Sequence, residues 1–235
     1  MVFTVLPALI PDIRVVYDAY FAAFAADPEG KSLLEIVFPG GYASEEFRAA
    51  HTAGILSWWH TSETQHTSKC IDNSTGAVAG MALFDVFVNG EKTRQNHGVP
   101  WLQGEQRDRA ERILNPLWEA REKSMSRPQV EFPAPNMQEN TSLFSNHVHA
   151  IAVDPAFQGR GAGATIVQSL IDLGNRSQLP IYLESTAAAE KLYRKMGFQR
   201  LPKDMASVVH NRKLLGKNAD MEVPLMIKQP SSPRL

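Results

Sequence analysis

The sequence has little cysteine, no long apolar run and no cluster of basic residues. Its 235 residues include one cysteine, Cys70, which excludes an intramolecular disulfide and a cysteine-rich zinc site and favours a reducing, cytoplasmic location. No stretch approaches the roughly 20 apolar residues of a membrane-spanning helix. The formal net charge is -1 and no Lys/Arg cluster is present, which argues against a nucleic-acid surface. We expect neither a membrane nor a nucleic acid as partner.

The apolar stretch over residues 2–8 predicts a strand rather than a signal peptide, because it lacks a basic leader and Pro7 and Pro11 interrupt it. With 43% hydrophobic residues, the chain has enough apolar material for one core. We expect a single domain over residues 1–227. A disordered tail over residues 228–235, with two prolines, is expected to follow.

Hydrophobic periodicity predicts helices and strands in the first half of the chain. A helix begins near Pro11 and ends at Asp27-Pro28, and a second begins at the cap Ser44. The predicted buried face of the first helix comprises Ile13, Val16, Tyr17, Tyr20, Phe21 and Phe24. Strands are expected over 67–72 and 77–88. Residues 89–145 form a less regular insertion with a charged helix near 105–124, interrupted at Asn115-Pro116, and could be either a substrate lid or a surface loop without a role.

The pattern is sharper from residue 147 onward. A strand over 147–153, a helix over 161–176 and a strand over 179–184 are followed by a helix over 187–196 that ends at Gly197. Two late strands are expected near 206–209 and 221–227.

A glycine-rich loop joins the strand and the helix of this region. The segment Gln-Gly-Arg-Gly-Ala-Gly covers residues 158–163, where glycines allow close approach of a ligand and the N–H groups of a helix start can hold a phosphate. A turn without a ligand is one alternative. A dinucleotide site is another, since Gly159, Gly161 and Ala164 give G-x-G-x-x-A and Glu184 lies where a ribose-binding acid would be expected. Only some 70 residues follow, without a further βαβ pattern, which argues against it.

Two motifs resemble those of the GNAT superfamily of acetyl-CoA-dependent N-acetyltransferases. Residues 158–163 match its Arg/Gln-x-x-Gly-x-Gly/Ala motif, and residues 189–198, Ala-Glu-Lys-Leu-Tyr-Arg-Lys-Met-Gly-Phe, are similar to its A-x-x-x-Y-x-x-x-G-F motif. The motifs are correctly ordered and span about 55 residues. The resemblance implies an α/β (α+β) fold with a mixed, mostly antiparallel central sheet flanked by helices, and acetyl-CoA as cosubstrate.

The resemblance also implies which residues hold acetyl-CoA. Pantetheine would lie on Ile151, Ala152 and Val153. The phosphates would lie on the loop and helix start formed by Gln158, Gly159, Arg160, Gly161, Ala162, Gly163 and Ala164. Thr186, which stands where the family often has Asn, keeps a hydroxyl but lacks the amide, and the resemblance would place it at the cofactor as well.

His147 and His149 lie two apart on a strand and therefore on one face, and an imidazole with a pKa near 6.5 suits a general base. Half a metal site is an alternative, but no third ligand has a recognisable spacing, so we expect no metal. A second alternative to the general-base role is that the two histidines pack or hydrogen-bond beneath the sheet. The strand over 147–153 resembles that of the arylalkylamine N-acetyltransferases, in which two histidines at these positions are thought to relay the proton of the amine.

Tyr193 stands at the family's tyrosine near the sulfur of CoA, where a phenol could protonate the departing thiolate; a core tyrosine is the alternative. A backbone N–H near Val153 would polarise the carbonyl. Glu184 is a further acid/base candidate, although a plain residue before a helix is favoured. We expect direct acetyl transfer to a small amine in a ternary complex, by a monomer or homodimer. The alternative is a non-catalytic module that binds or senses CoA.

Overall fold

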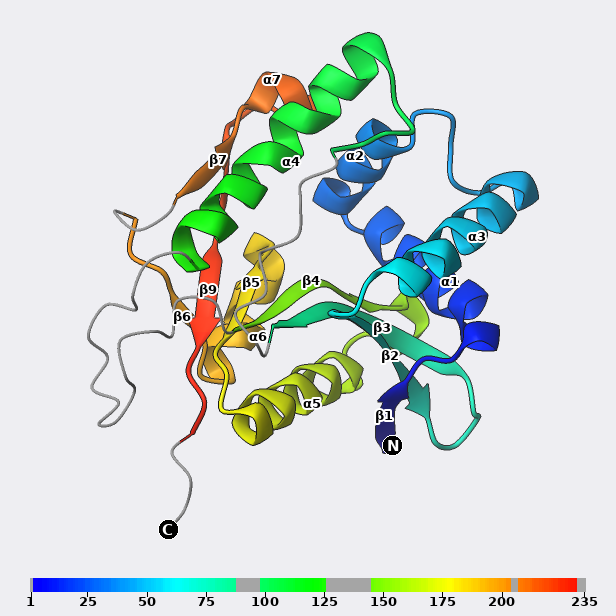
Figure 1. The fold of residues 1–235 in the computed structure, drawn as a ribbon, viewed down its shortest axis with the longest axis vertical. Coiled ribbons are helices and arrows are strands. Elements are labelled where there is room, and N and C mark those ends of the chain that lie inside the picture. Colours follow the sequence, from blue (N-terminus) through cyan, green and yellow to red (C-terminus); the bar gives the residue numbers. More distant parts are fainter. Residues whose placement is uncertain (1, 88–97, 126–144, 204–206, 232–235) are drawn as a thin grey trace. The chain divides into compact units, whose positions relative to one another are not determined.

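The computed structural model describes residues 2–87, 98–125, 145–203 and 207–231. The chain forms two compact units, one of Met1–Asp85 with Val148–Asp172 and the other of Val86–His147 with Leu173–Leu235. Among the described residues, seven strands hydrogen-bond in the order β1-β2-β3-β4-β5-β9-β6, and β7 and β8 form a second sheet (Figure 1). The pairs β1–β2, β2–β3, β5–β9, β6–β9 and β7–β8 are antiparallel. The predicted fold class is therefore confirmed.

The first unit consists of two segments of the chain, an N-terminal segment and a later one that begins within β4. Its elements are β1 (Phe3–Pro7), η1 (Ile10–Asp12), α1 (Ile13–Ala26), α2 (Pro28–Val37), α3 (Glu45–Thr61), β2 (Gln65–Asp72) and most of β3 (Val78–Phe87). The C-terminal part of β4 (Ser145–Val153), η2 (Pro155–Phe157) and most of α5 (Ala162–Ser177) complete it.

The core of the first unit forms where α1 packs on the sheet. Ile13, Val16, Tyr17 and Phe21 are buried, while Tyr20 and Phe24 are half-buried against the same cluster, so the predicted apolar face of this helix is confirmed. Asp27 caps α2 by accepting hydrogen bonds from the N–H groups of Glu29 and Gly30, with Pro28 as the first helical residue. The Asp-Pro pair thus ends one helix and begins the next, and sequence reasoning recognised only the first of these roles.

A close approach of β3 and β4 within the first unit requires a glycine. A Cβ added to Gly80 would lie 2.4 Å from the carbonyl oxygen of Ala152, which is closer than any ordinary contact. The next residue along β3 on one side, Ala79, accepts the N–H of Asp154 at 3.0 Å. Gly80 therefore sets the backbone spacing at the point where β4 leads into the glycine-rich loop.

The second unit contains the charged helix and the C-terminal strands. Its elements are α4 (Gly104–Met125), β5 (Ile181–Glu184), α6 (Ala187–Lys195), β6 (Gln199–Arg200), β7 (Val208–His210), α7 (Arg212–Leu215), β8 (Met221–Val223) and β9 (Leu225–Lys228). Leu201, Val208 and Leu225 pack with Ala120 and Tyr182 in its core. The strand predicted near 206–209 corresponds to β7, whereas the single strand predicted near 221–227 is divided into β8 and β9 at Pro224. Elements β6 and α7, of two and four residues, were too short to predict.

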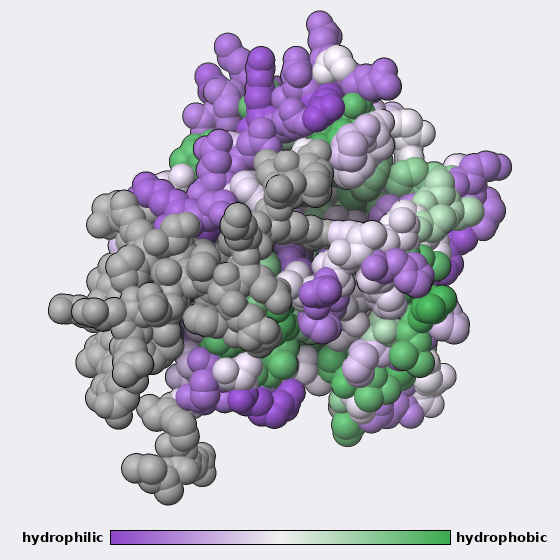
Figure 2. Space-filling model, viewed as in Figure 1, coloured by the Kyte–Doolittle hydropathy of each residue, from purple (hydrophilic) through white to green (hydrophobic). Residues whose placement is uncertain are grey.

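Helix α4 continues through Pro116, so the predicted interruption at Asn115-Pro116 is wrong. Proline removes one backbone donor and crowds the preceding turn. Here Ala110, Ile113 and Ala120 are buried on both sides of it at helical spacing, with Leu117 packed on the same core, and this apolar stripe holds the helix together. The opposite side of α4 is hydrophilic, as Figure 2 shows.

Parts of the predicted insertion and tail lie outside the described residues. For the 89–145 insertion this applies to residues 89–97 and 126–144, so its role as a substrate lid stays a prediction. At the C-terminus, Lys228 ends β9, and the N–H of Ser231 donates to Asn175 Oδ1 at 2.8 Å. None of the described helices is long and apolar enough to cross a membrane.

Candidate active site

The glycine-rich loop of the first unit has the backbone of an anion-binding turn. Gly159 and Gly161 have φ values of +72° and +98°, which side chains other than glycine rarely adopt. A Cβ at either position would meet nothing within 4 Å, so the backbone conformation, not crowding, requires glycine. Helix α5 starts at Ala162, and the first N–H groups of a helix have no partner within it. The residues present therefore fit a pyrophosphate held by backbone amides.

Side chains of the same loop brace it. Gln158 Nε2 donates to the carbonyl oxygen of Val153 at 3.0 Å, and Arg160 donates to that of Ala156 at 3.1 Å. The Arg160 guanidinium also lies over the ring of Phe157 and 3.7 Å from Asp72. Of the remaining predicted cofactor residues in this unit, Ala152 and Ala162 are buried, and Ile151, Val153, Gly163 and Ala164 are half-buried.

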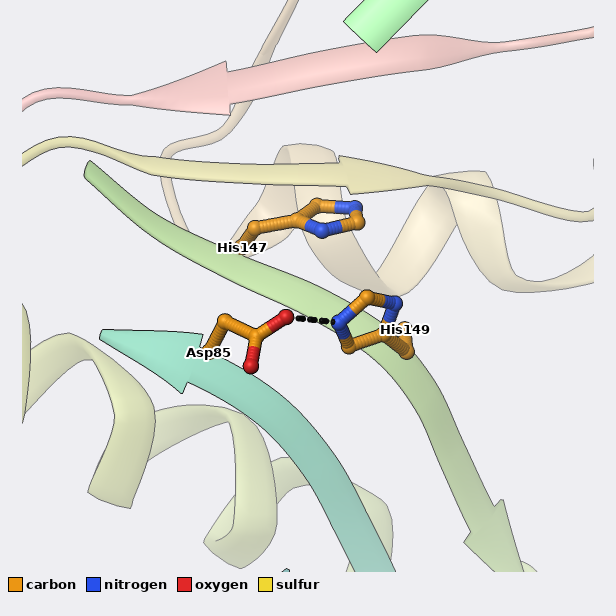
Figure 3. A group of neighbouring side chains, drawn as sticks. All are labelled: Asp85, His147 and His149. Carbon is orange, nitrogen blue, oxygen red and sulfur yellow. Dashed lines mark hydrogen bonds and ion pairs between the residues drawn. The ribbon is translucent and has the colours of Figure 1, made fainter. Parts of the chain in front are cut away.

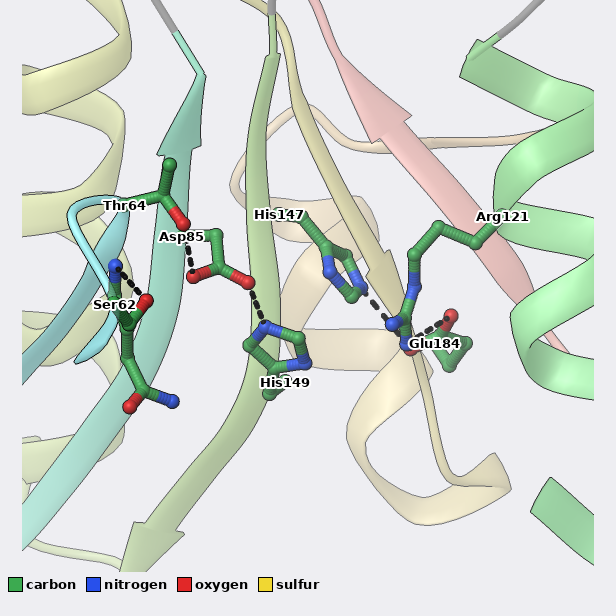
Figure 4. Close-up of polar contacts among 8 residues, drawn as sticks. Ser62, Thr64, Asp85, Arg121, His147, His149 and Glu184 are labelled. Atoms are coloured by element: carbon green, nitrogen blue, oxygen red, sulfur yellow. Dashed lines mark hydrogen bonds and ion pairs between the residues drawn. The ribbon is translucent and has the colours of Figure 1, made fainter. Parts of the chain in front are cut away.

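His149 of the first unit is held by a buried carboxylate that sequence reasoning missed. Its Nε2 lies 2.5 Å from Asp85 Oδ2, and the other carboxylate oxygen, Oδ1, accepts a hydrogen bond from the hydroxyl of Thr64 at 3.0 Å (Figures 3 and 4). Only 1% of the Asp85 side chain is exposed, against 18% for His149. Three elements therefore fix this imidazole: the approach to β2, β3 and β4.

His147 belongs to the second unit and contacts a different carboxylate. Its Nε2 lies 3.5 Å from Glu184 Oε2 at the end of β5, and Arg121 of α4 donates to both oxygens of Glu184, at 3.2 and 3.3 Å (Figure 4). The Tyr182 ring lies 5.4 Å from the His147 ring, centroid to centroid. Burial, and then the neighbouring Glu184 carboxylate, raise the pKa of Tyr182 well above its usual value, so its phenol stays protonated. Glu184, which the sequence indicated as a less favoured acid/base candidate, thus contacts His147, the favoured candidate for the base.

Tyr193 lies on α6 of the second unit with its side chain buried and its ring 5.6 Å from that of Phe198. Burial raises the pKa of its phenol to about 12. Thr186 is the N-cap of α6, where its hydroxyl accepts from the N–H of Ala189 at 3.3 Å. An N-cap role uses an oxygen that both Thr and Asn possess, which accounts for Thr at a position where the related motif often has Asn.

Asp85, together with the two histidines, makes a group of three residues of metal-binding types (Figure 3). Sequence reasoning had found no third ligand. Within the first unit, however, Asp85 and His149 lie 2.5 Å apart. Two ligands of one tetrahedral zinc, each about 2.0–2.1 Å from it, lie roughly 3.3 Å apart. The pair has the spacing of a hydrogen bond, and the absence of a metal stays a prediction.

Sequence reasoning missed Asp85, Thr64 and Arg121. Asp85 did leave a signal, because it is the only charged residue in the otherwise apolar run from 77 to 88. A lone carboxylate in a buried strand requires a partner. Arg121 left none, since it is one of many charged residues on α4.

Comparison with known proteins decides the family. Residues 134–200 match the model of the acetyltransferase (GNAT) domain. A probable acyltransferase of Ajellomyces capsulatus, SID5, is 29% identical over 156 residues, which are 66% of this chain and 96% of that protein. The chain contains a GNAT acetyltransferase domain.

Solved structures share the fold of this GNAT acetyltransferase along its whole length. Arylalkylamine N-acetyltransferase 2 of Aedes aegypti has a TM-score of 0.64 at 16% identity, with 97% of this chain and 99% of that chain covered. YncA of Salmonella typhimurium, a proposed acetyltransferase solved with its cofactor acetyl-CoA, has a TM-score of 0.51 at 15% identity, with 100% and 98% covered. At such identities the likeness concerns the fold. Acetyl-CoA fits both the family and the glycine-rich loop.

Proposed function

We propose that this acetyltransferase moves the acetyl group of acetyl-CoA to a small-molecule amine by direct attack in a ternary complex. The observation that carries the proposal is that each imidazole of β4, His147 and His149, contacts a carboxylate of its own unit. A carboxylate partner orients an imidazole and stabilises its protonated form, which a general base needs. The location proposed is the cytoplasm, with a monomer or homodimer as the active form.

In the proposed reaction a histidine acts as the base and Tyr193 as the acid. His147, directly or through His149 and water, takes a proton from the amine as its nitrogen bonds to the thioester carbon. The carbon–sulfur bond breaks, and Tyr193 gives its phenolic proton to the departing thiolate. Its pKa of about 12 keeps this proton in place at neutral pH. Exchange with solvent then returns His147 and Tyr193 to their starting states. The backbone N–H near Val153 is proposed to polarise the carbonyl.

Direct transfer is favoured over an acetyl-cysteine intermediate. Cys70 is the only cysteine of the chain, and its side chain is fully buried in β2. Burial raises the pKa of its thiol to about 11, so the thiolate that would attack acetyl-CoA is scarce at neutral pH.

The test measures thiol release from acetyl-CoA with a panel of arylalkylamines, polyamines and peptide N-termini. We expect turnover with at least one small amine, and turnover that a chelator leaves unchanged. Tyr193→Phe should lower kcat at least tenfold while binding of acetyl-CoA survives, because a positioned acid contributes about 10²–10⁴-fold. The His147→Ala/His149→Ala double variant should lose the acidic limb of the kcat/KM profile.

Three results would contradict the proposal. Binding of acetyl-CoA without turnover across the panel would indicate a non-catalytic CoA-binding module. An acidic limb that persists unshifted in the double variant would place the base elsewhere, with Glu184 as the next residue to replace. Inactivation by a chelator, reversed by added zinc, would contradict the metal-free reaction.

A further inference from the structure

We infer that Asp85 is a positioning residue that holds His149 in one tautomer, with Nε2 protonated and Nδ1 as the nitrogen that accepts a proton. The inference rests on the proposed role of His149 in proton transfer. It is carried by the 2.5 Å contact between His149 Nε2 and Asp85 Oδ2 and by the 3.0 Å hydrogen bond from Thr64 to Asp85 Oδ1.

The carboxylate of Asp85 is buried in an apolar strand, where packing alone does not account for it. It is 1% exposed in β3, a strand that is otherwise apolar. An unpaired charge in such a place is costly, and a buried carboxylate is retained where both oxygens are bonded. An apolar residue would satisfy the packing alone. The Thr64 hydroxyl donates to this carboxylate, and the His149 imidazole contacts it.

The direction of the two hydrogen bonds follows from the chemistry of the groups. An ionised carboxylate only accepts, so the Thr64 hydroxyl donates to Oδ1 and His149 must donate from Nε2 to Oδ2. In a neutral imidazole one nitrogen carries the hydrogen and the other has the lone pair. With Nε2 committed to Asp85, Nδ1 is the basic atom of His149.

Thr64 keeps the carboxylate from rotating. It lies in the short connection between α3 and β2, where the hydroxyl of Ser62 accepts the N–H of Gln65 at 3.2 Å, so the residues on both sides of Thr64 are tied together (Figure 4). With Oδ1 directed at Thr64, Oδ2 faces His149. The orientation of the imidazole is thereby tied to the end of α3.

The experiment replaces Asp85 by Asn, which keeps the shape and removes the charge. If Thr64 still donates to the side-chain oxygen, the amide N–H₂ faces His149 Nε2, which must then become an acceptor. The proton moves to Nδ1, and the tautomer is reversed, as happens when the carboxylate of a Ser-His-Asp triad is changed to an amide. The ¹⁵N chemical shifts of the His149 ring report the tautomer, and their loss in His149→Gln assigns them.

We expect Asp85→Asn to reverse the tautomer and to lower kcat roughly 10- to 100-fold, with the KM for acetyl-CoA within about twofold of the wild-type value. Asp12→Asn is the matched control, because it removes a carboxylate of the same unit that pairs with Lys69. It should change neither the tautomer nor kcat. Thr64→Val keeps the carboxylate and should keep the wild-type tautomer. A melting curve for each variant confirms that it is folded.

The outcomes separate this inference from the proposed function. An unchanged His149 tautomer in folded Asp85→Asn overturns the inference, whatever happens to turnover. A reversed tautomer with unchanged kcat overturns the part of His149 in the reaction, and with it the positioning role of Asp85. A reversed tautomer with a loss in kcat that Asp12→Asn does not show supports both.

Discussion

His51 lies on α3 among the aromatic rings of the first unit. Its ring centroid is 4.8 Å from that of Tyr17 and 5.1 Å from that of Phe21, and Phe47 stacks on it at 5.8 Å. Burial and then the nearby Arg48 lower its pKa from 6.5 to about 4. A histidine in such surroundings stays neutral at physiological pH, so it acts as a flat, weakly polar ring of the core.

This shift predicts a loss of stability in acid. The folded pKa of His51 lies below the unfolded value, so the unfolded chain takes up the proton first and stability is lost as the pH falls from about 6.5 toward 4. Allowing for partial exposure, the contribution is about 1–2 kcal/mol. His51→Leu should remove this part of the pH dependence of the free energy of unfolding, measured by denaturant titration. His60→Leu, an exposed position on the same helix, is the control; equal slopes in His51→Leu and wild type would contradict the assignment.

At the residue scale the two histidines of β4 differ in what holds them. His149 contacts a carboxylate that a hydroxyl fixes, whereas His147 contacts a carboxylate that a guanidinium pairs with. His147 and His149 are both histidines of the His-x-His segment and differ in their surroundings. One short segment therefore supplies two candidate proton-transfer groups of different character.

The glycine-rich loop is the element that we propose binds the cofactor. Gly161 needs a φ of +98°, and a side chain there both strains the backbone and covers the amides that follow it. Gly76, in the turn between β2 and β3, has a φ of +75° and equally open surroundings, so it carries the same backbone strain without a place in the loop.

We expect Gly161→Leu and Gly76→Leu both to lower the Tm of the protein without ligand, because a left-handed residue costs roughly 1–2 kcal/mol. Only Gly161→Leu should abolish the rise in Tm that acetyl-CoA causes, which at 100 times its Kd corresponds to about 2.7 kcal/mol. Differential scanning fluorimetry measures both effects. A normal ligand shift in Gly161→Leu would mean that the loop does not hold the pyrophosphate.

At the scale of the whole molecule the chain passes from one unit to the other three times, between Asp85 and Val86, between His147 and Val148, and between Asp172 and Leu173. The three crossings fall within β3, β4 and α5. Neither unit is therefore a continuous stretch of sequence that could be expressed by itself without cutting a strand or a helix.

This interleaving leads us to predict that residues 1–227 unfold as one domain. Calorimetry should give a single transition whose calorimetric and van't Hoff enthalpies agree. Acetyl-CoA should raise the temperature of that transition, and NAD should not. Two separable transitions would contradict the single domain, and a shift with NAD alone would favour the dinucleotide site that the same glycines resemble.

The sequence by itself determined most of the longer elements and the glycine-rich loop. Helical spacing from Ile13 to Phe24, the cap at Ser44 and the left-handed glycines of the loop act within a few residues, so their consequences can be predicted from short segments. Where prediction failed, tertiary packing outweighed a local rule. Pro116 did not break α4 because buried residues on either side hold the helix against the core of its unit.

Only the tertiary structure decided which groups accompany the histidines. Asp85 is 64 residues from His149, Glu184 is 37 from His147, and Arg121 is 63 from Glu184. Contacts across such separations depend on which strands pair and in which register, and shifting a strand by one residue turns every side chain to the other face. The sequence therefore identified the two imidazoles as proton-transfer candidates. The carboxylates that orient them became visible only once β3, β4, β5 and α4 were placed.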